Sequence, residues 1–149
     1  MTTAMTETET FVRCDAGHLH WGQNGAAGLL LAHIDASGVL RVMLHHRAAG
    51  THNAGTYGWP GGAIEDHESA LTAAYREADE ETGLTDLPGP VDMFVLSHGG
   101  WSYTTLLVHV DERYAAEDMW EGESVWVTVD EARRLPLVPG ALAAIDGLF

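Results

Sequence analysis

The sequence predicts a mixed α/β sandwich, in which one long helix and one short C-terminal helix pack against a β-sheet. Three observations support this fold class. Strand-like apolar runs precede and follow a helical segment, that segment carries an apolar stripe at helical spacing, and clusters of turn-forming residues separate the elements. With 149 residues, 46% of them hydrophobic, the chain is long enough for one domain with a substantial core.

Strands dominate the part of the chain before the long helix. Residues 26–34 are apolar and bounded by turn signals, which predicts a central strand. Asp35–Gly38 is a predicted hairpin turn, and Leu40, Val42 and Leu44 fall on one face of the strand that follows it. The predicted strands in this part are residues 11–14, 18–21, 26–34 and 39–46.

The long helix is predicted over residues 67–82, with Gly83 as its C-terminal cap. An apolar face at helical spacing should turn toward the core, and its members are Leu71, Ala74, Tyr75 and Ala78. After the helix we expect strands at 91–98, 101–110 and 125–129, and a C-terminal helix at 141–148. Asp130 is predicted to cap a short helical turn that ends at Arg134.

Composition limits the classes of function. The net charge is −15 and all seven cations are arginines, so the surface should repel nucleic acids and anionic membranes. No apolar run reaches the length of about 18 residues that predicts a membrane span. Residues 1–10 are polar and lack the features of a signal peptide, so we expect a disordered lead-in and a cytoplasmic protein. The single cysteine, Cys14, excludes an intrachain disulfide.

Three carboxylates crowd one face of the predicted long helix. Glu77, Glu80 and Glu81 fall within roughly one third of its circumference, where like charges repel one another. Carboxylate oxygens at such spacing suit a hard divalent cation, whereas the alternative is a solvated acidic face. The residues around the cluster favour the first interpretation.

The stretch from Gly61 to Leu84 resembles the signature box of the Nudix hydrolases. It has the fixed residues of that box at the fixed spacing: Gly62, Glu68, Arg76, Glu77, Glu80, Glu81, Gly83 and Leu84. Ala78 departs from the larger aliphatic residue usual in the family. The resemblance implies a Nudix-type α/β/α sandwich with a mixed sheet, formed by residues 11–149 as a single domain, in which the box makes a loop–helix–loop.

The resemblance also implies a metal site. The expected metal ligands are Glu77, Glu80, Glu81 and the backbone carbonyl of Gly61, holding Mg²⁺ or, as an alternative, Mn²⁺. We expect Arg76 to pair with Glu68 and so to orient the box carboxylates, rather than to bind phosphate. Gly62 and Gly83 are expected to be structural.

The identity of the catalytic base is left open by the sequence and by the family resemblance. The catalytic base is a box glutamate such as Glu77 or Glu80, or a glutamate on a later loop, where Glu121 and Glu123 are the candidates. Both of these distal residues could equally be solvated loop charges.

Substrate contacts are expected from three further residues. Arg47 starts R-A-A 14 residues before Gly61, a spacing that resembles MutT-type members, in which this arginine binds substrate phosphate. Trp101 and Tyr103 could stack on a nucleobase, but strand aromatics also serve in a core or a dimer interface, so a homodimer stays open. Near Pro139 the asparagine that reads the purine in MutT-type enzymes is replaced.

The sequence therefore predicts a Mg²⁺-dependent pyrophosphohydrolase. Its substrate would be a nucleoside diphosphate linked to another group, such as a nucleoside triphosphate or a nucleotide sugar, and water would attack phosphorus. The alternative is a non-catalytic sensor of the same fold, which would bind a nucleotide and regulate a partner. Retention of every box carboxylate favours the enzyme.

Overall fold

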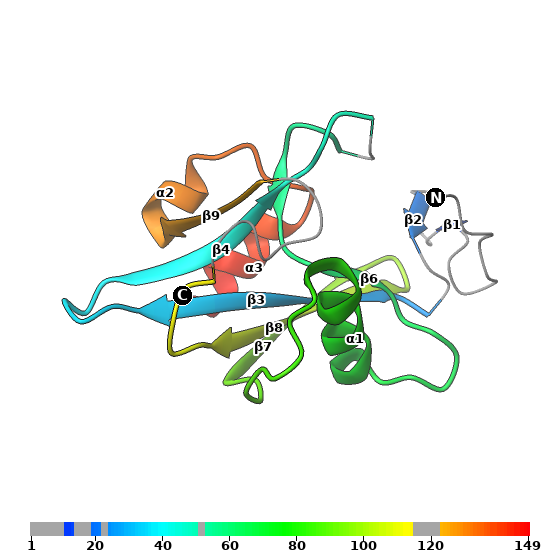
Figure 1. The fold of residues 1–149 in the computed structure, drawn as a ribbon. Coiled ribbons are helices and arrows are strands. Elements are labelled where there is room, and N and C mark those ends of the chain that lie inside the picture. Colours follow the sequence, from blue (N-terminus) through cyan, green and yellow to red (C-terminus); the bar gives the residue numbers. More distant parts are fainter. Residues whose placement is uncertain (1–10, 14–18, 22–23, 51–52, 115–122) are drawn as a thin grey trace.

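A mixed seven-stranded sheet forms the centre of the molecule (Figure 1). The computed structural model describes residues 11–13, 19–21, 24–50, 53–114 and 123–149. The strand order is β5-β4-β3-β8-β7, with β6 also pairing with β3 and β9 with β4. The strands are β3 (Ala26–Ile34), β4 (Leu40–His46), β5 (Tyr57–Gly58), β6 (Gly61–Ala63), β7 (Asp92–His98), β8 (Trp101–His109) and β9 (Glu123–Thr128).

The strand directions make the sheet mixed, as predicted. β3 and β8 run parallel, with Leu29 beside Leu106, whereas the other pairings in the described sheet are antiparallel. Two further short strands, β1 (Phe11–Arg13) and β2 (Leu19–Trp21), pair only with each other. The expected N-terminal lead-in, residues 1–10, lies outside the described residues.

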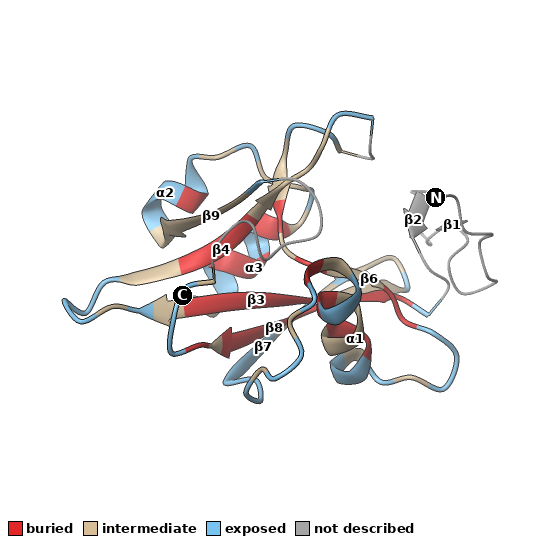
Figure 2. Ribbon diagram, in the orientation of Figure 1, coloured by how far each residue is buried: buried red, intermediate tan, exposed pale blue. Residues whose placement is uncertain are grey.

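Helices cover both faces of the sheet, which confirms the α/β/α sandwich. α1 (Ala70–Thr82) packs on one face over a core that contains Leu29, Leu31 and Leu106. α2 (Val129–Arg133) and α3 (Ala141–Leu148) accompany the second core, on the face that Leu30 and Leu107 share. Because neighbouring residues of β3 point to opposite faces, this one strand supplies both cores and is buried along most of its length (Figure 2).

The helix α1 begins three residues later than the sequence predicts. His67 has a φ of 65°, a left-handed conformation that an α-helix excludes. Ser69 is the N-cap, and its Oγ accepts a hydrogen bond of 3.1 Å from the Thr72 N–H. At the other end Gly83 is the C-cap, with a φ of 76°, as predicted.

Two other local predictions are wrong. Leu71 does not face the core but is 48% exposed, because the buried stripe of α1 runs through Ala73, Ala74 and Ala78. The cap of α2 is Thr128 and not Asp130. Thr128 and Glu131 form a capping box, in which each side chain accepts a hydrogen bond from the other residue's backbone N–H.

The short strand β6 places the start of the box against the centre of the sheet. Gly61 is the register partner of Gly28 on β3, and the Leu29 N–H donates to the Pro60 carbonyl at 2.9 Å. α1 packs against both β3 and β6, so its side chains meet the glycine turn directly. Within the described residues, no helix is long and apolar enough to cross a membrane.

Candidate active site

The glycine turn at Gly61 and Gly62 receives two carboxylates from α1. Glu81 Oε2 accepts a hydrogen bond of 2.8 Å from the Gly61 N–H. Glu77 lies against Gly62 so closely that a Cβ on this glycine would be 2.6 Å from Glu77 Oε1. The turn therefore has to lack side chains for the carboxylates to reach its backbone.

Glu81 occupies an electrostatically costly position. Its burial, together with the neighbouring charge of Glu77, raises the pKa of Glu81 to about 8, although the Gly61 N–H and Arg47 act in the opposite direction. Such a group favours the addition of positive charge nearby. The chemistry of the donor set fits a divalent cation, because carboxylate and peptide oxygens are the ligands that Mg²⁺ prefers.

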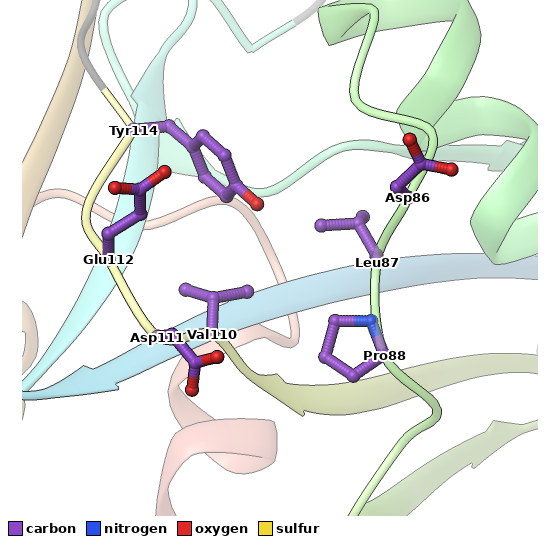
Figure 3. A pocket seen from close by; sticks show the side chains of 7 residues that line it. All are labelled: Asp86, Leu87, Pro88, Val110, Asp111, Glu112 and Tyr114. Atoms are coloured by element: carbon purple, nitrogen blue, oxygen red, sulfur yellow. The ribbon is translucent and has the colours of Figure 1, made fainter.

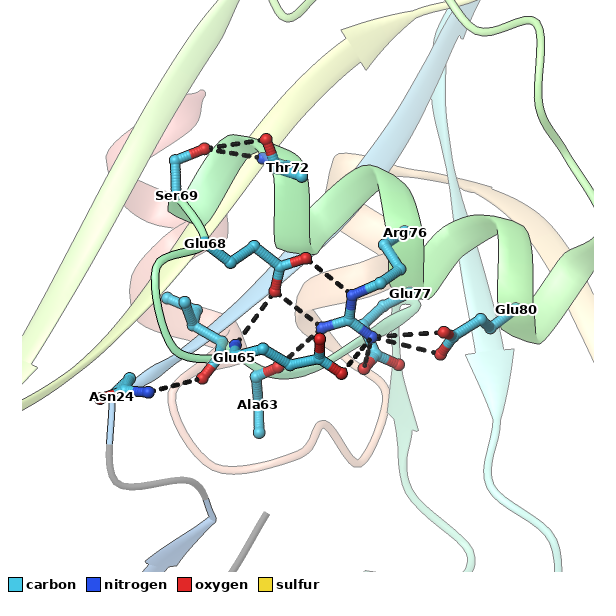
Figure 4. Close-up of polar contacts among 10 residues, drawn as sticks. Asn24, Ala63, Glu65, Glu68, Ser69, Thr72, Arg76, Glu77 and Glu80 are labelled. Carbon is cyan, nitrogen blue, oxygen red and sulfur yellow. Dashed lines mark hydrogen bonds and ion pairs between the residues drawn. The ribbon is translucent and has the colours of Figure 1, made fainter. Parts of the chain in front are cut away.

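Arg76 organises the remaining box carboxylates (Figure 4). Its guanidinium holds Glu68 with two hydrogen bonds, of 2.8 and 2.9 Å, so the predicted pairing is observed. The same side chain lies 3.0 Å from Glu77 and 3.3 Å from Glu80, and it donates to the Ala63 carbonyl. The bond with Arg76 holds the pKa of Glu68 below its ordinary value.

The three predicted metal ligands of α1 do not converge in the structure. In the part of the chain that is described, no three His, Cys, Asp or Glu side chains are grouped so that they could hold one metal ion. Glu77 and Glu81 lie at the glycine turn, whereas Glu80 is exposed and lies beside Arg76. Binding one ion with all three would require Glu80 to leave Arg76.

The predicted contacts outside the box are placed unevenly. Arg47 follows β4 and lies close enough to Glu81 to lower its pKa. Glu123 is the first residue of β9 and is exposed; it pairs with His46, the residue before Arg47. The other candidate base, Glu121, lies outside the described residues.

The two predicted stacking residues differ in position. Trp101 is half-buried at the start of β8, with its ring 6.4 Å from that of Tyr103. The Tyr103 hydroxyl is deeply placed between Gly28 and Gly61, in the space that a Cβ on either glycine would occupy. Sequence reasoning missed Gly28, although an isolated glycine within a strand is a signal of close backbone approach.

An open pocket lies next to the segment that follows the box (Figure 3). It has a volume of about 490 Å³, and none of the predicted site residues lines it. One wall comes from the loop after α1 and the other from the segment after β8; the lining residues are Asp86, Leu87, Pro88, Val110, Asp111, Glu112 and Tyr114. Its three carboxylates give it no obvious role toward an anionic substrate.

The α/β/α sandwich and the glycine turn with its carboxylate-bearing helix define the class of protein as a Nudix-type domain. The model of the NUDIX domain matches residues 25–147. The chain belongs to the Nudix family, of which it is a MutT-like member.

Curated relatives share this family. The chain is 37% identical over 142 residues to "Putative 8-oxo-dGTP diphosphatase 3" of Mycobacterium tuberculosis, which covers 90% of this chain and 65% of that protein. It is 41% identical over 133 residues to the "Nucleoside triphosphate pyrophosphatase/Nudix hydrolase fusion protein" of Bifidobacterium longum. That match covers 81% of this chain and 27% of the fusion protein. The chain thus spans less than two thirds of the length of either relative.

Solved structures agree with the fold. RenU, a Nudix hydrolase of M. smegmatis, superposes with a TM-score of 0.76 at 34% identity, over 93% of this chain and 92% of that one. A mutT/nudix family protein from Listeria innocua superposes with a TM-score of 0.64 at 25% identity, over 85% of this chain and 92% of that one. An Ap4A hydrolase of C. elegans shares the fold. It superposes with a TM-score of 0.65 at 18% identity, over 83% of this chain and 94% of that one.

Proposed function

We propose that this chain is a Mg²⁺-dependent pyrophosphohydrolase that cleaves a phosphoanhydride bond in a nucleoside diphosphate linked to another group. The observation that carries the proposal is the meeting of Glu81 with the Gly61 N–H at 2.8 Å, beside Glu77. A divalent cation would stabilise the ionised form of this half-buried carboxylate, whose pKa is raised to about 8 and which lies next to a second carboxylate.

The proposed metal ligands are the Gly61 carbonyl, Glu77, Glu80 and Glu81. Mn²⁺ should support activity in place of Mg²⁺. The bound ion would neutralise phosphate oxygens and lower the pKa of a water molecule. Arg76 and Glu68 would hold Glu77 in orientation, because the two-bond pair fixes the guanidinium 3.0 Å from Glu77. Glu80, which lies beside Arg76, would leave it to bind the ion. Gly62 leaves room for Glu77, and Gly83 ends the helix.

Nucleoside triphosphates are the first substrate class to test. Arg47 lies near Glu81, where it could contact a substrate phosphate, and its spacing from the box is that of MutT-type members. The M. tuberculosis relative carries the name of an 8-oxo-dGTP diphosphatase, so the oxidised nucleotide belongs in the test. Trp101, half-buried at the start of β8, is the proposed stacking contact for the base.

A screen of phosphate release tests this proposal. The purified protein is given nucleoside triphosphates with and without the 8-oxo group, nucleotide sugars, ADP-ribose and dinucleoside polyphosphates, each with Mg²⁺ and with EDTA. We expect turnover of at least one compound that EDTA abolishes. Metal binding without any turnover would favour a nucleotide sensor of this fold instead.

The catalytic base requires its own comparison. Glu121→Gln, Glu123→Gln and Glu80→Gln are assayed for kcat as a function of pH on the best substrate. The variant that loses the acidic limb of the pH profile identifies the base, because that limb reports the base in the enzyme–substrate complex. Equal pH profiles in all three variants would leave Glu77 as the remaining candidate.

The setting follows from the same proposal. Residues 11–149 would act as one domain, in the cytoplasm and on a small-molecule substrate. The surface charge of −15 disfavours nucleic acids and anionic membranes as partners. Sedimentation of the protein would show whether it is a monomer or a homodimer.

A further inference from the structure

Two glycines face each other where the box begins. Gly28 on β3 and Gly61 on β6 are register partners in an antiparallel pair. A Cβ at Gly61 would be 2.7 Å from the Ala27 carbonyl oxygen, and one at Gly28 would be 2.8 Å from the Pro60 carbonyl oxygen. Real Cβ atoms do not come so close to backbone atoms, so both positions require glycine in this arrangement.

The gap between these glycines is filled by the Tyr103 hydroxyl. A Cβ on Gly28 and a Cβ on Gly61 would each collide with Tyr103 Oη, which makes this oxygen the common neighbour of both. Tyr103 comes from β8, where it is the register partner of Ala26. The Tyr103 hydroxyl therefore contacts both Gly28 on β3 and Gly61, the first residue of the turn.

The same glycine, Gly61, is held from a second side by Glu81. The Gly61 N–H donates to Glu81 Oε2 at 2.8 Å. The Tyr103 hydroxyl is also close enough to this site to interact with its charges. Its burial raises its pKa well above the ordinary value, and the charges of Glu81 and Glu77 raise it further. The Tyr103 hydroxyl thus lies against Gly61 and close to the carboxylates, while the residue as a whole is half-buried.

We propose that Tyr103 is a positioning residue that fixes Gly61, and that Gly28 is required in part because a side chain there would displace the Tyr103 hydroxyl. This inference rests on the proposed function, in which the Gly61 carbonyl and Glu81 hold the metal. Tyr103 and Gly28 act through Gly61, so neither touches the substrate. A side chain at Gly28 would push Tyr103 toward the Gly61–Glu81 pair and misplace two metal ligands together.

The first test measures metal affinity without substrate. Mn²⁺ is titrated into Gly28→Ala and followed by electron paramagnetic resonance, and thermal unfolding without metal checks that the variant is folded. The dissociation constant should rise by about tenfold, the scale expected when the support of a metal ligand is lost. Gly89→Ala is the matched control, because a Cβ there meets no atom within 4 Å, and its affinity should equal that of the wild type.

The second test asks whether the collision with the hydroxyl causes the loss. Tyr103→Phe removes the oxygen atom and keeps the ring, so Gly28→Ala should cost less in the Tyr103→Phe background than in the wild type. We expect the effect on Mn²⁺ affinity to shrink by about threefold or more, a coupling typical of residues in contact. Recovery should be incomplete, because the Pro60 carbonyl remains close to the new Cβ.

The third test does not depend on metal or on the folding of Gly28→Ala. Hydrogen exchange of the Gly61 amide, read by nuclear magnetic resonance, should accelerate by about tenfold in Tyr103→Phe if the hydroxyl holds this peptide. Exchange of the Gly89 amide should not change.

Three results would overturn the inference. They are wild-type Mn²⁺ affinity in folded Gly28→Ala, a loss that is as large in the Tyr103→Phe background, and unchanged Gly61 exchange in Tyr103→Phe. Failure of the proposed function looks different, since the wild-type protein itself would then neither bind Mn²⁺ nor hydrolyse any compound.

Discussion

The two groups of carboxylates on and around α1 differ in what neutralises them. Glu68 is bound by Arg76 through two hydrogen bonds, and its pKa is lowered as a result. Glu81 is half-buried at the glycine turn, where its carboxylate accepts a hydrogen bond from the Gly61 N–H, and its pKa is raised to about 8. Two acidic residues 13 positions apart in one sequence box therefore have opposite electrostatic environments.

This difference separates a structural region from a reactive one. Around Arg76 the protein supplies its own cation, so that region gains hydrogen bonds and a fixed geometry at the start of α1. At Glu81 the nearby Arg47 only partly offsets burial and the charge of Glu77. A cation bound from solution stabilises the site most where the protein's own positive charges do not neutralise its carboxylates.

The largest expected effect comes from changing the carboxylate at the glycine turn. Glu81→Gln keeps the shape but removes the charge, and should lower kcat/KM by more than the roughly 100-fold that marks the upper end for residues supporting metal ligands. Asp79→Asn is the matched control, since Asp79 is an exposed acid on the same helix. Steady-state kinetics on the best substrate of the screen makes the measurement, and full activity of Glu81→Gln would show that this carboxylate binds no essential metal.

A smaller effect is expected from removing the cation of the structural region. Arg76→Gln strands Glu68, Glu77 and Glu80, so it should lower activity by about 10- to 100-fold and destabilise the fold by about 2 kcal/mol. Steady-state kinetics measures the loss of activity, and urea unfolding measures the loss of stability.

Arg133→Gln serves as the control for Arg76→Gln. Arg133 also pairs with two carboxylates, Asp130 and Asp146, but on an exposed surface, where an ion pair contributes about 0.5 kcal/mol and should not affect catalysis. If the two arginine variants lost equal stability, the distinction between the Arg76 cluster and an ordinary surface pair would be wrong.

The smallest expected effect is a change in acid stability. Because the folded-state pKa of Glu68 lies below its ordinary value of 4.5, its contribution to stability is present above pH 4.5 and is lost as the pH falls through the folded value. Glu68→Gln should therefore be less stable than the wild type at neutral pH, and this difference should diminish below pH 4.5. Thermal unfolding from pH 3 to pH 7 measures it; a constant difference would contradict the assigned ion pair.

The sequence predicts much of this comparison because the box is local. Helical spacing alone places Glu77, Glu80 and Glu81 on one face. The expected pairing of Arg76 with Glu68, a carboxylate of the same box, is a contact that is observed. Strand periodicity likewise gives β3, β7 and β8 within about two residues, because alternation and turn residues are short-range signals. The start of α1 was mispredicted because the backbone of His67, and not its residue type, excludes it from the helix.

Long-range register explains what the sequence does not predict. Nothing near Gly28 in the sequence shows that it will face Gly61, and nothing near Tyr103 shows that its hydroxyl will enter the gap between them. The unequal burial of Glu80 and Glu81, adjacent in sequence, is also a tertiary effect, because only Glu81 points to the glycine turn. Periodicity assigns residues to a face, but it does not determine which partner covers that face.

Metal affinity at the glycine turn tests the central claim most directly. Mn²⁺ is titrated into the wild-type protein, Glu81→Gln and Asp79→Asn at neutral pH, with electron paramagnetic resonance as the readout. Our account predicts that the wild type and Asp79→Asn bind Mn²⁺ equally, and that the dissociation constant of Glu81→Gln is higher by at least about tenfold. Equal affinity in all three proteins would contradict the assignment of Glu81 and Gly61 to the metal site.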